Sequence, residues 1–122
     1  WNFPRAGGQF GQPVALTEEE ILNIIARFGT AARVCKETGF TGVQIHSAHG
    51  YLLSSFLSPV TNQRKDNYGG SLENRLRFPL EVFDAVRSAF PADRPVWVRL
   101  SATDWVDGGW TIEFYEGGFL KP

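Results

Sequence analysis

Two segments of helical pattern alternate with two short segments of strand pattern, and this order limits the folds open to the chain. Thr17 and Glu20 have the spacing of a capping box, in which each side chain accepts from the other residue's backbone amide. Apolar residues then recur at steps of four and three, which predicts a helix at about 18–37. Ser71 is the expected N-cap of a second helix, which Pro79 should interrupt or kink.

Strand patterns lie at 42–46 and 95–101, where apolar and polar residues alternate. Helices between such strands predict a parallel sheet, in either a doubly wound fold or a (β/α)8 barrel. A doubly wound sheet is covered by helices on both faces and should be apolar on both. Here one face is polar, which favours the barrel; it carries Gln44, His46, Trp97 and Arg99.

The predicted class is therefore α/β, a partial (β/α)8 TIM barrel of about two βα units with a long active-site loop. Two strands cannot close a barrel, and the complete fold typically has about 250 residues. We therefore expect this chain of 122 residues, which starts at Trp1 without an initiator Met, to be a fragment of a larger protein.

Composition excludes several classes of protein. The net charge of -1, with acidic and basic residues interspersed, argues against binding to nucleic acid. No apolar run approaches the roughly 18 residues of a membrane helix. The single Cys35 cannot form an intramolecular disulfide and is predicted to be a small core residue. A reducing, cytoplasmic location fits these features.

The long segment at 47–70 is the first candidate for function. Its glycines, prolines and asparagines predict a loop, although 52–57 could form a short helical turn. Loops longer than about 12–15 residues in a compact domain are usually functional or disordered. This one begins at the carboxyl end of a predicted strand, where barrel enzymes place their active sites.

His46 and His49 stand at the start of this loop, and three interpretations of them compete. They could be structural, paired with loop carbonyls. They could be metal ligands, although a third ligand would be needed and Asp66 or Asp104 are the only nearby candidates. They could also act as hydrogen-bond donors or acid-base groups together with Tyr51.

Five runs of the sequence, taken together, form a specific signature. They read VQIHSAHGYL, FLSP, NQR, DNYGGSLENR and VRLS. In these runs the chain resembles the old yellow enzyme family of FMN-dependent ene-reductases. The resemblance extends from about 13 to 113 and covers the third helix, fourth strand, fourth helix and fifth strand of the family's barrel.

The resemblance implies an enzyme that uses FMN and takes a hydride from NADPH or NADH. The hydride would pass to the β-carbon of a small activated alkene, conjugated to a carbonyl or nitro group. His46 and His49 are implied to donate hydrogen bonds to the substrate's carbonyl oxygen, and Tyr51 to protonate the α-carbon. Arg99 is implied to lie beside N1 and the C2 carbonyl of the flavin. No metal is implied. The full-length protein could form a homo-oligomer.

The same residues have structural alternatives. Tyr51 could anchor the loop, Arg99 could form a buried ion pair, and Trp97 could fill the barrel interior. A charged cluster around the Gly-Gly turn is expected to be a loop clamp. That cluster consists of Arg64, Asp66, Asn74 and Arg75.

The expected organisation is one partial FMN-binding barrel domain across 1–122. It divides into a loop at 1–16, family-like βα units at 17–111 and an atypical tail at 112–122, where two glycines and Pro122 oppose the expected helix. The alternative function is an inactive truncated fragment with only a structural or interaction role. The flavin's phosphate site belongs to strands outside this segment, so the fragment alone is expected to bind FMN poorly.

Overall fold

The computed structural model describes residues 13–111 and contains helices and strands in the predicted order. The elements are α1 (Glu18–Glu37), β1 (Val43–Ser47), α2 (Leu52–Leu57), α3 (Leu72–Ala89) and β2 (Val96–Leu100). The predicted tail at 112–122 and most of the predicted first loop lie outside the described residues. No helix within the described range is long and apolar enough to cross a membrane.

Helix α1 begins where the capping box predicts. The Thr17 hydroxyl accepts from the Glu20 amide at 3.2 Å, and the Glu20 carboxylate accepts from the Thr17 amide at 2.7 Å. The helix ends at Glu37, two residues before Gly39, whose φ of 85° lies in the left-handed region that favours glycine. The predicted bounds of this helix are confirmed.

Helix α3 also starts at its predicted cap, where the Ser71 hydroxyl accepts from the Asn74 amide at 3.3 Å. The interruption expected at Pro79 is wrong, because the helix runs unbroken to Ala89. A proline removes one helical hydrogen bond. Its neighbours Phe78 and Val82 are completely buried, and this packing offsets the cost.

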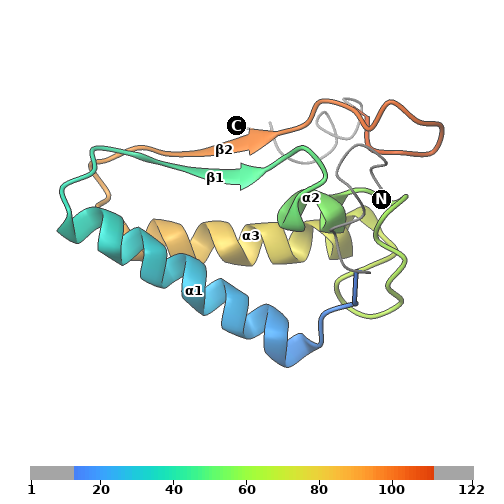
Figure 1. The fold of residues 1–122 in the computed structure, drawn as a ribbon, viewed down its shortest axis with the longest axis horizontal. Helices are drawn as coiled ribbons and strands as arrows, with labels where there is room; N and C mark the ends of the chain where they lie inside the picture. The colour runs from blue at the N-terminus through green and yellow to red at the C-terminus, as the bar shows by residue number, and fades with distance from the viewer. Residues whose placement is uncertain (1–12, 112–122) are drawn as a thin grey trace, which may run out of the picture.

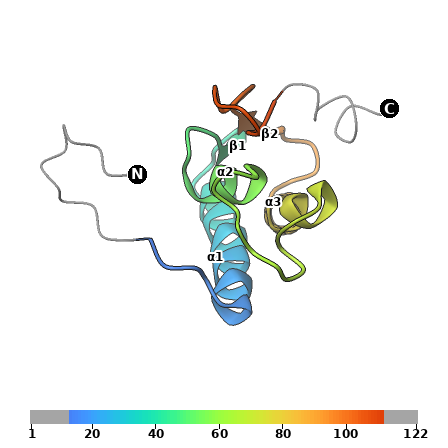
Figure 2. The same cartoon turned by 90° about the vertical axis from the view of Figure 1, so that its right-hand side faces the viewer.

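The two strands pair in parallel, as predicted, with Val43 opposite Val96 and Ser47 opposite Leu100. Figure 1 shows both arrows pointing the same way, toward α2 and the long loop, with α1 and α3 lying together on one side of the sheet. Figure 2 shows the same arrangement from the side. The described chain is thus two layers, a sheet and a pair of helices.

The hydrophobic core lies between those two layers. Ile21 from α1 and Phe78 and Val82 from α3 are completely buried, and Ile45 of β1 is 5% exposed. Burying one such side chain contributes about 1.5–3 kcal/mol. Cys35 is half-buried and packs against this cluster, as predicted.

The other face of the sheet is open in the described chain. Its residues are the polar set predicted from the alternation, and all four are exposed: Gln44, His46, Trp97 and Arg99. Because the residues of one strand point alternately to the two faces, burial of Ile45 forces His46 to this open face.

Candidate active site

His46 and Arg99 lie side by side on the open face of the sheet. They are direct partners in the parallel register, and neighbouring strands are about 4.8 Å apart. Both side chains are exposed. The buried ion pair considered for Arg99 is not formed within residues 13–111, where no carboxylate pairs with the exposed guanidinium. The arginine therefore presents its charge to whatever occupies this face.

The chain turns sharply after β1. His49 and Gly50 have φ values of 60° and 73°, and the left-handed region is rare for a residue with a side chain. The His49 amide donates to the Ser101 hydroxyl oxygen at 2.9 Å, and the Gly50 amide donates to the Ser54 hydroxyl oxygen at 3.3 Å. This turn leads the chain directly into α2.

The turn gathers three aromatic side chains at the carboxyl end of β1. The rings of His46 and His49 have centroids 5.1 Å apart and planes at 86°. The rings of His46 and Tyr51 have centroids 5.3 Å apart and planes at 81°. All three side chains are exposed, and Tyr51, at 66% exposure, is the N-cap of α2 without its hydroxyl forming a capping bond. The structure thus brings the sequence-predicted residues together on an accessible surface.

The hydrogen bonding of His46 fixes which ring nitrogen can donate. Its Nδ1 accepts from the Ala48 amide at 3.2 Å. A ring nitrogen that accepts a hydrogen bond carries no proton, so the imidazole bears its proton on Nε2. Nε2 is the donor that His46 offers to a ligand.

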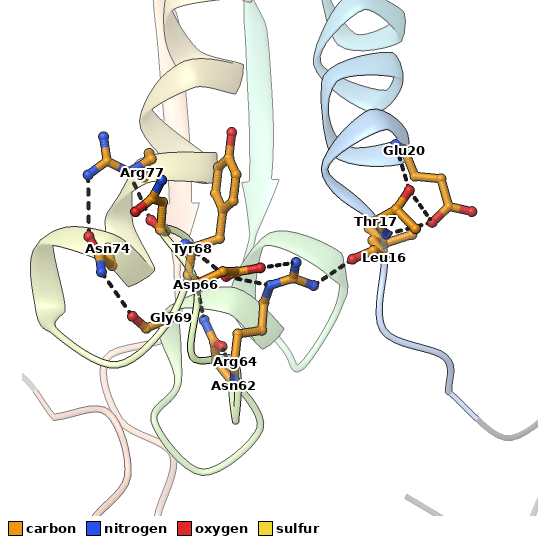
Figure 3. Close-up of polar contacts among 11 residues, drawn as sticks. Leu16, Thr17, Glu20, Asn62, Arg64, Asp66, Tyr68, Gly69, Asn74 and Arg77 are labelled. Atoms are coloured by element: carbon orange, nitrogen blue, oxygen red, sulfur yellow. Dashed lines mark hydrogen bonds and ion pairs between the residues drawn. The ribbon is translucent and has the colours of Figure 1, made fainter.

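The charged cluster of the long loop is a clamp, as predicted (Figure 3). Arg64 donates two hydrogen bonds to the Asp66 carboxylate, at 3.1 and 2.6 Å, and one to the Leu16 carbonyl at 2.7 Å. We call these three residues the Arg64 clamp. Its hydrogen bonds lower the pKa of Asp66 below the ordinary value, although partial burial acts in the opposite direction. The clamp ties the long loop to the entry of α1.

The remaining members of the cluster hold the Gly-Gly turn to its surroundings. Asn74 donates from Nδ2 to the Gly69 carbonyl at 3.1 Å. Arg75 is buried and donates to the carbonyls of Leu57, at 2.8 Å, and Gly70, at 2.5 Å. Both residues are structural in this geometry, as expected.

Asn62 is a structural residue whose role the sequence analysis missed. It is buried and donates from Nδ2 to the carbonyls of Phe56, at 2.8 Å, and Tyr68, at 2.7 Å. Tyr68 in turn donates to the Glu81 carboxylate at 3.1 Å. Burial is the larger cause and this bond the smaller cause of a raised pKa at Tyr68. The FLSP and NQR runs are thereby joined to α3.

The loop after β2 is organised by Asp104, which was considered as a metal ligand. Its Oδ2 accepts from the Ser58 hydroxyl at 2.5 Å and from the Trp110 amide at 2.7 Å. Asp66 is likewise committed to Arg64. In the part of the chain that the structure describes, no three His, Cys, Asp or Glu side chains are grouped to hold a metal ion.

Sequence reasoning also missed the link between Ser101 and His49. Serine was present in the VRLS run, but its partner lies 52 residues away. The loop that follows contains Gly108 and Gly109, the only local sign of a tight structure there. Trp110, 3% exposed, closes it by donating from Nε1 to the Ser101 carbonyl at 3.1 Å.

An apolar groove of 250 Å³ lies on the opposite face of the sheet from these rings. It is lined by Ser47, Leu57, Pro79, Leu80, Phe83, Val98 and Leu100. Its lining carries almost no polar surface and no acid-base group, so it offers a packing surface rather than chemistry.

Known proteins resemble this chain over most of its length. The family model described as NADH:flavin oxidoreductase / NADH oxidase family matches residues 4–117. An NADPH dehydrogenase from Listeria welshimeri serovar 6b is 47% identical over 104 residues, which cover 85% of this chain and 30% of the relative.

Two solved structures share the fold. A complex of 2-naphthoyl-CoA reductase with 2-naphthoyl-CoA has a TM-score of 0.80 and 44% identity, covering 84% of this chain and 16% of that one. Morphinone reductase in complex with tetrahydroNAD has a TM-score of 0.76 and 42% identity, covering 87% and 29%. The chain therefore spans 30% or less of each of these three proteins.

Proposed function

The chain belongs to the NADH:flavin oxidoreductase / NADH oxidase family, the old yellow enzyme family, and on that premise we propose that it is part of an FMN-dependent ene-reductase. The whole protein would reduce the C=C bond of α,β-unsaturated carbonyl or nitro compounds with NADPH or NADH. This segment would supply the side chains that hold and protonate the substrate. Its two βα units are part of a (β/α)8 barrel.

One observation carries the proposal: the rings of His46, His49 and Tyr51 meet on an exposed surface at the carboxyl end of β1. Arg99 stands next to His46 on the same face. Two nitrogen donors, one phenol and one cation in this arrangement suit a substrate whose carbonyl oxygen gains negative charge.

The histidines would stabilise that charge. When a nucleophilic hydride reaches the β-carbon of an enone, electron density moves to the carbonyl oxygen and an enolate develops. Nε2 of His46, which carries the ring proton, donates to this oxygen together with the imidazole of His49. Because the oxygen is more negative in the transition state than in the substrate, these bonds lower the barrier.

Tyr51 would complete the reduction. Its hydroxyl proton goes to the α-carbon, where the enolate's electron pair forms the new C–H bond. The resulting phenolate takes a proton from water, to which its side chain is 66% exposed in this chain. A phenol hydroxyl can serve as the general acid for this step, because the enolate carbon is a base that accepts its proton.

The residues present fit the flavin's polar edge. Arg99 is an exposed cation with no acidic partner among residues 13–111, and it would hold the N1 and C2 carbonyl side of FMN. A fixed guanidinium there stabilises negative charge on a reduced ring. Bound FMN would supply the redox chemistry by accepting a hydride from NAD(P)H and giving it to the alkene.

The test is steady-state reduction of a cyclic enone and of a nitroalkene by the purified full-length protein, under nitrogen, with NADPH and NADH compared. We expect a flavin spectrum and saturable turnover. Replacing either histidine (His46→Ala or His49→Ala) should lower kcat/KM by roughly 10²–10³-fold. Gln44→Ala, on the same face of β1 but without an assigned role, should leave it unchanged. A colourless protein, or a flavoprotein reduced by NAD(P)H but never reoxidised by either alkene, would contradict the proposal.

A second candidate is a chain that only packs against other polypeptides. The observation in its favour is the apolar groove, together with 36% exposure of Val98 and 42% exposure of Leu80 at its edge. Titration of the 122-residue chain with FMN tests this second candidate. Saturable quenching of flavin fluorescence is incompatible with a purely structural fragment, whereas no quenching agrees with both candidates because the flavin's phosphate site belongs to other strands.

A further inference from the structure

The imidazole of His49 depends on an unusual backbone conformation. His49 has a φ of 60°, which a residue with a side chain rarely adopts, and the following Gly50 continues the left-handed turn. An extended conformation at His49 would aim its ring elsewhere. Something in the fold must therefore hold this turn.

Among residues 13–111, one long-range hydrogen bond reaches the backbone of this turn, and it comes from the residue that follows β2. The His49 amide donates to the Ser101 hydroxyl oxygen at 2.9 Å, across 52 residues of sequence. Ser101 directly follows β2 and lies two residues after Arg99, so the bond joins the ends of the two strands. It couples the strand that carries Arg99 to the turn that carries His49.

Ser101 is itself held by the loop that follows it. Trp110, almost completely buried, donates from Nε1 to the Ser101 carbonyl at 3.1 Å. The Trp110 amide and carbonyl both bond to Asp104, at 2.7 and 2.8 Å. A serine whose backbone is anchored in this way presents its hydroxyl oxygen to the His49 amide from a fixed position.

We infer that Ser101 is a positioning residue: its hydroxyl oxygen holds the His49 amide, and so keeps the His49 imidazole beside that of His46. This inference deepens the proposed function and rests on it for its effect on the reaction. Loss of the hydroxyl leaves the exposed amide to water, so the turn loosens without the chain unfolding. The two donors then no longer converge on one oxygen.

The first experiment uses the full-length protein with Ser101→Ala and Ser101→Thr, the second of which keeps a hydroxyl. Stopped-flow measurements follow the reoxidation of reduced flavin by a cyclic enone and, separately, by O2, which needs no carbonyl donor. Ser101→Ala should slow the enone reaction by roughly 10-fold or more, since small misplacements of reacting groups have effects of this size. Its O2 reaction should be unchanged, and Ser101→Thr should restore most of the enone rate.

Two controls separate positioning from a general loss of stability. Ser71→Ala removes another hydroxyl that accepts from a backbone amide, at the cap of α3, and should lower the melting temperature without slowing the enone reaction. Ser101→Ala should add nothing once His49→Ala is present, because a residue acting through His49 has no further effect in its absence. An additive loss in the double variant would overturn the inference, as would an enone rate in Ser101→Ala equal to that of the unmodified protein.

A second measurement does not depend on the reaction. Hydrogen exchange of the His49 amide, followed by NMR with 15N-histidine, should be faster in Ser101→Ala and restored in Ser101→Thr. If the unmodified protein reduces no alkene, the proposed function fails while this result still decides the role of Ser101. Equal exchange in all three proteins would show that Ser101 does not hold the turn.

Discussion

Tyr51 and His46 touch one another but are bound to the chain in different ways. His46 is oriented by a bond from the Ala48 amide to its ring, so its donor atom is fixed. The Tyr51 hydroxyl takes part in no capping bond of α2 and faces water. A fixed donor suits stabilisation of charge, whereas an accessible hydroxyl suits the delivery and recovery of a proton.

Tyr51→Phe separates these two roles. The ring that packs against His46 is retained and only the hydroxyl is lost. We expect the oxidation of reduced flavin by an enone to fall by roughly 100-fold or more, because general acid catalysis has effects of this size. The KM for the enone and the reduction of flavin by NAD(P)H should change little. Stopped-flow measurement of each half-reaction tests this. An unchanged oxidation rate would show that water, and not Tyr51, supplies the proton to the α-carbon.

At the scale of secondary-structure elements, the long loop is held to the helices by two devices. The Arg64 clamp joins it to the entry of α1. The second device is a close approach of backbones, since a Cβ added at Gly69 would lie 2.4 Å from the carbonyl oxygen of Arg64. Charge and close packing thus act on the same segment.

Asp66 gives the clamp a pH dependence with a defined sign. Its pKa in the folded chain is below the unfolded value of about 3.9. The ionised carboxylate therefore stabilises the fold above about pH 3.9, and this contribution is lost as the pH falls through the lower, folded-state pKa. Because Asp66 is 36% exposed, the contribution should be at most about 1 kcal/mol.

Asp66→Asn should therefore lower the free energy of unfolding at pH 7, and its difference from the unmodified protein should vanish in acid. Urea unfolding at a series of pH values measures this. The matched control is Glu37→Gln, which breaks the exposed pair of Arg33 and Glu37 at 4.0 Å and should have almost no effect. A difference that grows as the pH falls would show that the sign is wrong.

Gly69→Ala tests the close approach, and Gly29 provides its matched control. The atoms that an alanine at 69 would meet belong largely to the Arg64 backbone and cannot move cheaply, so we expect a loss of about 1–3 kcal/mol. At Gly29, inside α1, the nearest atom to an added Cβ is 3.6 Å away. Gly29→Ala should be neutral or stabilise by up to about 1 kcal/mol. Thermal unfolding of both variants measures the contrast, and equal melting temperatures would refute it.

For the molecule as a whole, local signals were sufficient to predict the elements and their faces. The caps at Thr17 and Ser71 lie within three residues of their partners, and strand alternation is visible in five residues. The interruption expected at Pro79 did not occur, because burial of its neighbours Phe78 and Val82 depends on tertiary packing that the local pattern does not contain.

The residues of the candidate site could be selected from the sequence, but the contacts that hold them could not. The resemblance of short runs selected His46, His49, Tyr51 and Arg99, and the structure brings the three rings together. The bond from His49 to Ser101 joins segments 52 residues apart. Such a contact exists only once the strands have paired, so no local pattern could indicate it.

The parallel register has a consequence for misfolding. His46 stands opposite Arg99 only while Ile45 is paired with Val98. A slip of one residue would rotate the whole set of side chains, bringing Ile45 to the open surface and the imidazole among the helices. Burial of the core therefore also selects the register that the site needs. A mispaired sheet would lose its hydrophobic contacts, so a chain with a misplaced donor would be unstable.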